Sequence, residues 1–347
     1  MAQEILPLKN KSENIILNNF PQKENFNCID IIKFLCAILV CAIHINPFTS
    51  DLFGVNLSFW LKQYVCRIAV PFYFVCAGFF LFRKMDIESP NTRLIKSYCF
   101  KIARLLGIWT IILFAGASSQ LWYLNGLFVA VLILSLLFYL KIKFGYICLI
   151  VFLLYVIGLF GDSYYGFVEP LKGYTITNYV ISHYDSIFST TRNGLFFGVP
   201  FVFMGAIFAK KRIEINNIVA LFGFVVSIIL LFFEVYLLSH FSSPKDYNMY
   251  LCLLPTVFFL FYFCTHIKLK NRKIYVKLRI YGILIYFLHL LVGYFVNAIS
   301  VVLKNNFKIN LSSFKFLFTL LISLFVAILI ERLSRTKTFR WLKYLYS

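Results

Sequence analysis

The sequence predicts an all-α polytopic membrane protein with about ten transmembrane helices and both termini in the cytoplasm. Its composition carries most of that prediction, because 61% of the 347 residues are hydrophobic and only 14% are charged. A soluble globule of this length needs a far more charged surface. The net charge of +20 does not indicate nucleic acid, since the basic residues stand between apolar runs, where they act as topology signals.

Apolar stretches long enough to cross a hydrocarbon layer of ~30 Å recur along the chain. The sixth stretch is short, and the second is expected to begin as an interfacial helix. The ten expected spans are 30–47, 58–82, 98–117, 121–140, 144–161, 194–209, 215–239, 247–266, 280–300 and 312–332.

Alternate loops differ sharply in charge, which sets the expected orientation. Basic residues gather after the second, fourth, sixth, eighth and tenth spans, and only scattered ones occur in the other loops. Positively charged loops stay in the cytoplasm, so both termini are expected there and the longest outer loop, 162–193, which is aromatic and polar, is expected outside. The predicted organisation is a cytoplasmic tail (1–29), a membrane domain (30–333) and a basic cytoplasmic tail (334–347).

The nine cysteines lie mostly inside the apolar runs and form no CxxC pair. This pattern favours small apolar side chains over disulfides, and no metal site is predicted.

The first span holds two ionisable side chains, Lys33 and His44, eleven positions apart. Such groups are expensive inside hydrocarbon, so a span that keeps both is expected to carry chemistry. At ~1.5 Å of rise per residue they lie roughly 16 Å apart along a helix, which places one near each face of the membrane.

Other polar residues are expected at the depth of His44. Counting helical rise from the inner face puts His44 at ~21 Å and Arg67 at ~24 Å. His289, on a span expected to start at residue 280, falls nearer the midplane at ~13 Å. The remaining candidates for substrate binding lie at the outer ends of spans or near His289: Trp122, Arg192, Asn193, Glu234 and Tyr286.

Two kinds of role are open for these side chains. His44 could take a proton from a hydroxyl nucleophile, and Arg67 or Arg192 could hold an anion or a developing oxyanion. Alternatively, His44 makes a helix–helix hydrogen bond without chemistry, while Arg67 pairs with Glu234 or reaches to the interface.

Several blocks in order resemble acyltransferase family 3, the integral membrane O-acyltransferases of bacterial envelopes. Beside the first span, they extend over almost the whole chain: 67–81 (RIAVPFYFVCAGFFL), 121–124 (LWYL), 192–198 (RNGLFFG) and 285–289 (IYFLH). The resemblance implies about ten spans in the cytoplasmic membrane, acyl-CoA as donor, expected to be acetyl-CoA, and a hydroxyl of an envelope glycan or lipid-linked sugar as acceptor. It implies no tightly bound cofactor.

The resemblance also assigns residues. It marks His44 as catalytic, here with Arg67 beside it, and places Lys33 where the family has a donor-binding arginine. Lysine keeps the charge but lacks the planar fork that binds phosphate at two points.

An exporter or flippase of a lipid-linked or polymeric envelope saccharide is the alternative function. Arg67, Arg192 and Glu234 would then form a polar pathway through the membrane. A membrane sensor has no support, since no output domain is recognised.

Overall fold

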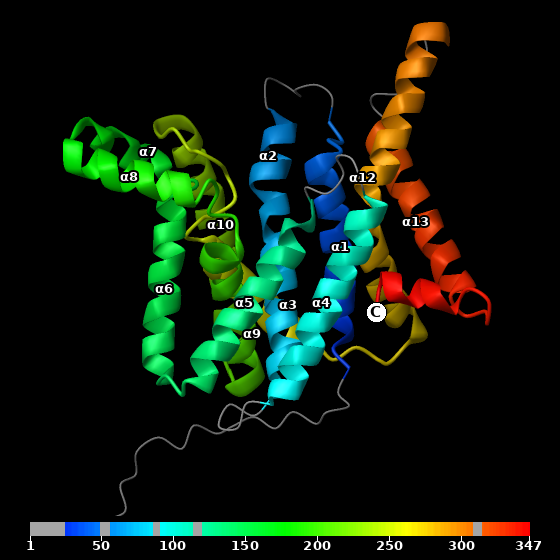
Figure 1. Cartoon of the computed structure of the whole chain (residues 1–347), viewed down its shortest axis with the longest axis horizontal. Helices are drawn as coiled ribbons and strands as arrows, with labels where there is room; N and C mark the ends of the chain where they lie inside the picture. The colour runs from blue at the N-terminus through cyan, green and yellow to red at the C-terminus, as the bar shows by residue number, and fades with distance from the viewer. Residues whose placement is uncertain (1–24, 49–55, 86–90, 114–119, 308–313) are drawn as a thin grey trace, which may run out of the picture.

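The computed structural model describes residues 25–48, 56–85, 91–113, 120–307 and 314–347, and their regular structure is helical. Figure 1 shows an upright bundle from which one arm projects sideways. Six described helices are long and apolar enough to cross a membrane. They are α1 (Asn27–His44), α2 to α3 (Leu57–Phe82), α5 (Trp122–Tyr139), α10 (Asn217–Phe241), α12 (Lys273–Phe307) and α13 (Lys315–Leu333). The prediction of an all-α multi-pass membrane protein is confirmed.

The count of ten spans is not confirmed. A seventh span results if α6 (Phe144–Phe160) is joined with the segment Tyr165–Gly173, which is bent from it by 80°. The other predicted spans correspond to helices that are shorter or more charged: α4 (Thr92–Ile112), the pair η4 (Gly194–Gly198) and α9 (Val199–Lys210), and α11 (Leu253–His266).

The centre of the bundle is the crossing of α3 and α9. A Cβ atom at Gly78 would collide with the backbone oxygen of Val202, and one at Gly205 would collide with that of Val75. The two glycines therefore allow the backbones to touch, as small residues do at membrane helix crossings.

At the end of the bundle that carries Lys33, which the predicted topology makes the inner end, α1 is tied to α12. The Arg279 guanidinium donates from Nε to Asp30 Oδ1 at 2.8 Å and from Nη2 to Oδ2 at 2.7 Å. This two-point bond fixes the register of the helices that carry His44 and His289.

Residues 247–252, predicted to be helical, are not helical because two carboxylates bind their backbone. Glu234 accepts the N–H groups of Leu251 at 2.5 Å and Cys252 at 2.8 Å. Asp162 accepts those of Asn248 and Met249 at 2.7 and 3.0 Å. Irregular backbone at membrane depth is tolerated where the protein satisfies it in this way.

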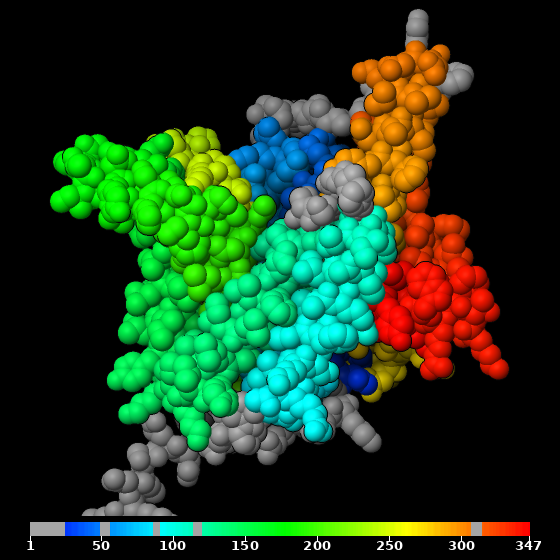
Figure 2. Space-filling model, in the orientation of Figure 1, coloured from blue at the N-terminus to red at the C-terminus, as the bar shows by residue number. Residues whose placement is uncertain are grey.

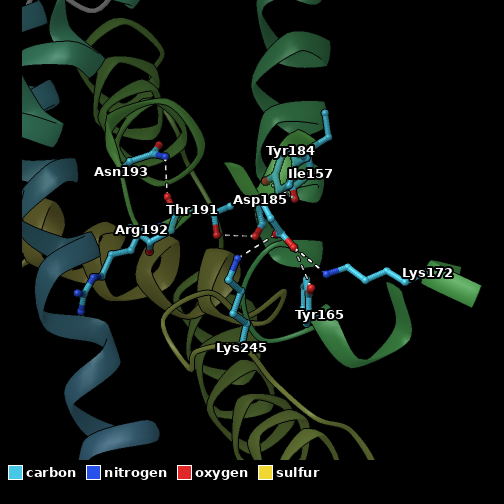
Figure 3. A network of polar contacts seen from close by, with 11 residues as sticks. Ile157, Tyr165, Lys172, Tyr184, Asp185, Thr191, Arg192, Asn193 and Lys245 are labelled. Atoms are coloured by element: carbon cyan, nitrogen blue, oxygen red, sulfur yellow. Dashed lines mark hydrogen bonds and ion pairs between the residues drawn. The ribbon is translucent and has the colours of Figure 1, made fainter. Parts of the chain in front are cut away.

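The projecting arm consists of α7 (Tyr165–Val168), η3 (Glu169–Gly173) and α8 (Thr175–Ile187) (Figure 1). Figure 3 shows Lys172 and Lys245 reaching Asp185 of α8 from different sides, with Nζ–O distances of 3.1 and 2.9 Å. The Lys172 pair lies within the arm, and the Lys245 pair joins the arm to the loop before α11.

The C-terminal segment packs on the bundle. Its helix η6 (Arg340–Leu345) buries Leu342 and Leu345, and the Leu345 carbonyl accepts Nε1–H of Trp109 on α4 at 3.0 Å. Figure 2 shows this red segment against the cyan α4. Residues 334–347, predicted as a tail, therefore form part of the packed structure. Most of the predicted N-terminal tail (1–29) lies outside the described residues.

Candidate active site

A small polar cavity of about 50 Å³ lies near the predicted outer end of the bundle. His44 and Arg67 both line it, which confirms that they share one depth. Its other polar lining residues are Gln120, Trp122, Arg192, Asn248 and Tyr286. Side chains from α1, the second span, α5, α12 and three connecting segments thus meet at one point.

His289 lies beside His44 and not nearer the midplane. The two imidazole ring centroids are 5.3 Å apart. The depth prediction was wrong because α12 begins at Lys273, seven residues before the expected start, which adds ~10 Å of rise below His289. The Nδ1 atom of His289 is 3.1 Å from the Ile285 carbonyl, so Nδ1 carries the proton, while its buried Nε2 has no partner in the described part of the chain.

The two arginines converge on one amide oxygen. Arg67 donates from Nη1 to Asn248 Oδ1 at 2.6 Å, and Arg192 donates from its Nη1 to the same atom at 3.4 Å. Arg67 also donates from Nε and Nη2 to the Gln63 side chain. The Arg192 guanidinium lies 5.1 Å from the centre of the Trp122 ring. Arg67 does not pair with Glu234.

Asp162 fixes the amide that the arginines share. Its Oδ2 atom accepts Nδ2–H of Asn248 at 3.1 Å, so the amide oxygen must face the guanidinium groups. Asp162 is 1% exposed, and its oxygens are occupied by Asn248 and Met249.

A larger cavity of about 250 Å³ lies below the outer one. Tyr286 lines both cavities, and its hydroxyl donates to the Gln120 carbonyl at 2.5 Å. The walls of the lower cavity are mainly aromatic and aliphatic, with Tyr73, Tyr98 and Tyr123 among them.

Lys33 lines this lower cavity and also a third cavity of about 570 Å³ at the inner end. The third cavity is strongly basic. Its cationic lining residues are Lys33, Lys84, Lys101, Arg104 and Arg279, and its one acidic lining residue is Asp30. Three cavities whose linings share residues therefore lie in series between the level of Lys33 and that of His44.

Three predicted substrate-binding residues do not line the outer cavity: His289, which lies beside His44 as described above, Asn193 and Glu234. Asn193 caps η4, where its Oδ1 atom accepts the N–H groups of Leu195 and Phe196 at 2.9 and 3.0 Å. Glu234 holds the backbone before α11, as described above. Substrate contact by the other predicted residues remains a prediction.

Three residues of the site were missed by the sequence reasoning: Gln120, Asp162 and Asn248. A signal existed for Asp162, an acidic residue directly after a span in a chain with only 14 acidic residues. The side chains of Gln120 and Asn248 are neutral amides. The rule that ionisable groups inside a membrane indicate function therefore could not identify them.

The fold and cavities define a multi-pass membrane protein with a basic pocket at one end and a histidine–arginine pocket near the other. Residues 26–332 match the family model Acyl_transf_3, described as an acyltransferase domain. The chain belongs to this family, acyltransferase family 3, which confirms the resemblance and the enzyme class it implies.

Curated relatives with other names are also similar. Two proteins named "Amino-acid racemase" from Enterococcus faecalis are 31% identical over 279 residues (72% of this chain, 37% of the relative) and 29% identical over 353 residues (90% and 47%). A "Serine/alanine racemase" from Enterococcus gallinarum is 27% identical over 266 residues (67% and 36%). The chain spans less than half the length of these relatives. No solved structure matches it.

Proposed function

We propose that the protein is an O-acyltransferase of the bacterial cytoplasmic membrane. It moves an acyl group, most simply acetyl, from cytoplasmic acyl-CoA to a hydroxyl of an envelope glycan or related acceptor, with His44 as the general base. The observation that carries the proposal is the series of cavities from the basic inner pocket to His44.

The donor would enter from the inner end. The phosphates of coenzyme A suit the pocket lined by Lys33, Lys84 and Lys101. The pantetheine arm then extends along the cavities past Tyr286, a path of the same order as the ~16 Å that helical rise puts between Lys33 and His44.

The acceptor would meet the thioester at the outer cavity. Its hydroxyl oxygen attacks the thioester carbonyl as an imidazole nitrogen of His44 takes the hydroxyl proton. The C–S bond breaks, the thiolate leaves on coenzyme A, and the proton passes from His44 to that sulfur. His289, next to His44, would orient its ring.

A second candidate function follows from the relatives named as racemases of amino acids. The outer cavity of about 50 Å³ has two guanidinium groups, and these suit the carboxylate of a small amino acid. A protein that binds or moves an amino acid, like the saccharide exporter considered above, would consume no acyl-CoA.

His44 variants test the proposal. We expect His44→Ala to remain folded but to lose acyl transfer from acetyl-CoA by roughly 10²-fold or more, since a positioned base contributes about that factor. His44→Gln should be equally inactive, because glutamine keeps a hydrogen bond but takes no proton at neutral pH. The measurement is release of the coenzyme A thiol by purified protein given envelope glycan.

The matched control is His240→Gln, at the exposed end of α10, which should keep the wild-type rate. Near wild-type release by His44→Gln would exclude His44 as the base. Wild-type protein that binds acceptors but never releases coenzyme A would favour the second candidate.

A further inference from the structure

We infer that the outer cavity is an anion site, so that the acceptor carries a carboxylate or phosphate close to the hydroxyl that is acylated. The identification of the bound anion as the acceptor rests on the proposed function. The anion site itself is inferred from the contacts of Arg67 and Arg192 alone.

Both arginines have only neutral hydrogen-bond partners. Arg67 binds the amides of Gln63 and Asn248, and Arg192 shares the Asn248 oxygen at the longer distance of 3.4 Å. The Nε atom of Arg192 is buried and has no partner within the described ranges. Each guanidinium carries more N–H donors than these bonds use, so donors remain for a ligand.

The carboxylate that binds Asn248 does not pair with the arginines. No ion pair among the described residues includes Arg67 or Arg192. Asp162 uses its oxygens on Asn248 and Met249, and the Asn248 side chain lies between it and the two cations. The aspartate thereby orients a neutral acceptor without neutralising the arginines.

Two like charges at membrane depth need a counter-charge. A cavity of about 50 Å³ exceeds the ~10–15 Å³ that one water requires by the same measure and suits a single carboxylate or phosphate. A whole sugar would not fit in it, so the rest of the acceptor must extend from the mouth.

The position of His44 in the same lining links this site to the reaction. An anion held by the arginines would place a neighbouring hydroxyl of the same molecule against the imidazole. The two arginines would thus select anionic hydroxyl compounds over neutral ones and would position the selected compound for the reaction.

Protection of Arg192 from phenylglyoxal, followed by mass spectrometry of its peptide, tests the site in purified protein without acyl-CoA. The anionic probes are glucuronate, glycerol 3-phosphate and L-serine, and the neutral partners are glucose and glycerol. We expect at least one anionic probe to slow the modification of Arg192 by 10-fold or more where the neutral compounds do not. Arg212, whose side chain is 64% exposed, is the internal control and should stay reactive.

Desulfo-coenzyme A distinguishes the two sources of phosphate. Protection of Arg192 by desulfo-coenzyme A alone would assign the arginines to the donor and overturn the inference. Equal protection by glucose, or protection by none of the anions, would overturn it as well.

Variants make the same test by affinity. Arg192→Gln should raise the concentration of the anionic probe that half-protects Arg67 by roughly 10-fold to 100-fold, the usual effect of losing a charge-assisted contact. Arg192→Lys keeps the charge and is the safer variant for folding, and it should raise this concentration less. Arg212→Gln should leave the concentration unchanged. Protection without any release of coenzyme A would sink the proposed acyl transfer and leave the anion site standing.

Discussion

Asn248 shows how a single neutral residue can shape the chemistry of a charged pocket. A carboxylate in its place would form ion pairs with Arg67 and Arg192 and occupy the donors that a ligand needs. The amide instead holds both guanidinium groups by one oxygen, while its nitrogen is bound to Asp162. The pocket therefore keeps a positive charge and a fixed geometry together.

Lys33 is the residue on which donor binding is predicted to depend. We expect Lys33→Ala to raise the KM for acetyl-CoA, because a cation at the cavity entrance attracts the donor phosphates, and Lys33→Arg to keep or improve it. Steady-state kinetics with acetyl-CoA as the varied substrate measure this. Lys96→Ala, an exposed α4 residue, is the control. Unchanged donor kinetics in Lys33→Ala would remove Lys33 from the donor site.

The residues of the site that lie on helices could be placed from the sequence, and those in loops could not. Helical rise put His44 and Arg67 at one depth, because both stand on helices whose ends were nearly right. His289 was misplaced by an error of seven residues in the start of its helix. The contacts of Asn193 and Asn248 could not be predicted, because the directions of their side chains depend on loop backbone that no periodicity describes.

The crossing of α3 and α9 depends on the absence of side chains at its two glycines. We expect Gly78→Ala to lower the thermal unfolding midpoint in detergent, since overpacking costs about 1–3 kcal/mol and the obstructing atom is backbone. Gly107→Ala is the matched control: its Cβ would meet nothing within 4 Å, and a helical glycine replaced by alanine gains up to ~1 kcal/mol. Equal midpoints for the two variants would contradict the close crossing.

The arm is attached to the loop before α11 by the Lys245–Asp185 ion pair, and this attachment should depend on pH. Burial favours the neutral carboxyl, but Lys245, Lys172 and the Tyr165 hydroxyl outweigh it and hold the pKa of Asp185 below its ordinary value. The stabilisation is therefore complete above that ordinary value, ~4, and is lost as the pH falls through the lower folded pKa.

We expect Asp185→Asn to speed amide hydrogen exchange in α8 by a few-fold at pH 7, since partly exposed pairs contribute about 0.2–1 kcal/mol each. Glu169→Gln, an exposed change on the same arm, should have no effect. Exchange in α8 that is identical for Asp185→Asn and wild type would show that the pairs do not hold the arm.

At the level of elements, hydropathy predicted where apolar segments lie but not where helices begin. The predicted span 247–266 starts late at Leu253 because Glu234 and Asp162 bind the backbone before it. Such contacts join residues far apart in sequence, so no local pattern reports them. The arm was predicted only as an aromatic and polar outer loop.

The orientation of the whole chain remains a prediction from loop charge. In a background without reactive cysteines, we expect an impermeant maleimide to label Ile176→Cys on the arm in intact cells. Lys270→Cys, between α11 and α12, should be labelled only after the cells are opened. The reverse pattern would overturn the topology and exchange the donor and acceptor ends of the cavities.

The fold class could be predicted from composition, because a soluble protein of this length could not bury a chain that is 61% hydrophobic. The docking of the C-terminal segment was not accessible. It depends on the Trp109 indole and the Leu345 carbonyl, whose contact spans 236 positions.

The contact between Tyr286 and Gln120 has a consequence for the cell as a whole. Water-filled spaces on both sides of a membrane that met through an open file would conduct protons and discharge the electrochemical gradient. Here the lower and outer cavities share the side chain of Tyr286, and its hydroxyl is bound to a backbone carbonyl at 2.5 Å. If the proposed thioester arm passes this point, it must displace the ring, and the ring must return between turnovers for the membrane to stay electrically insulated.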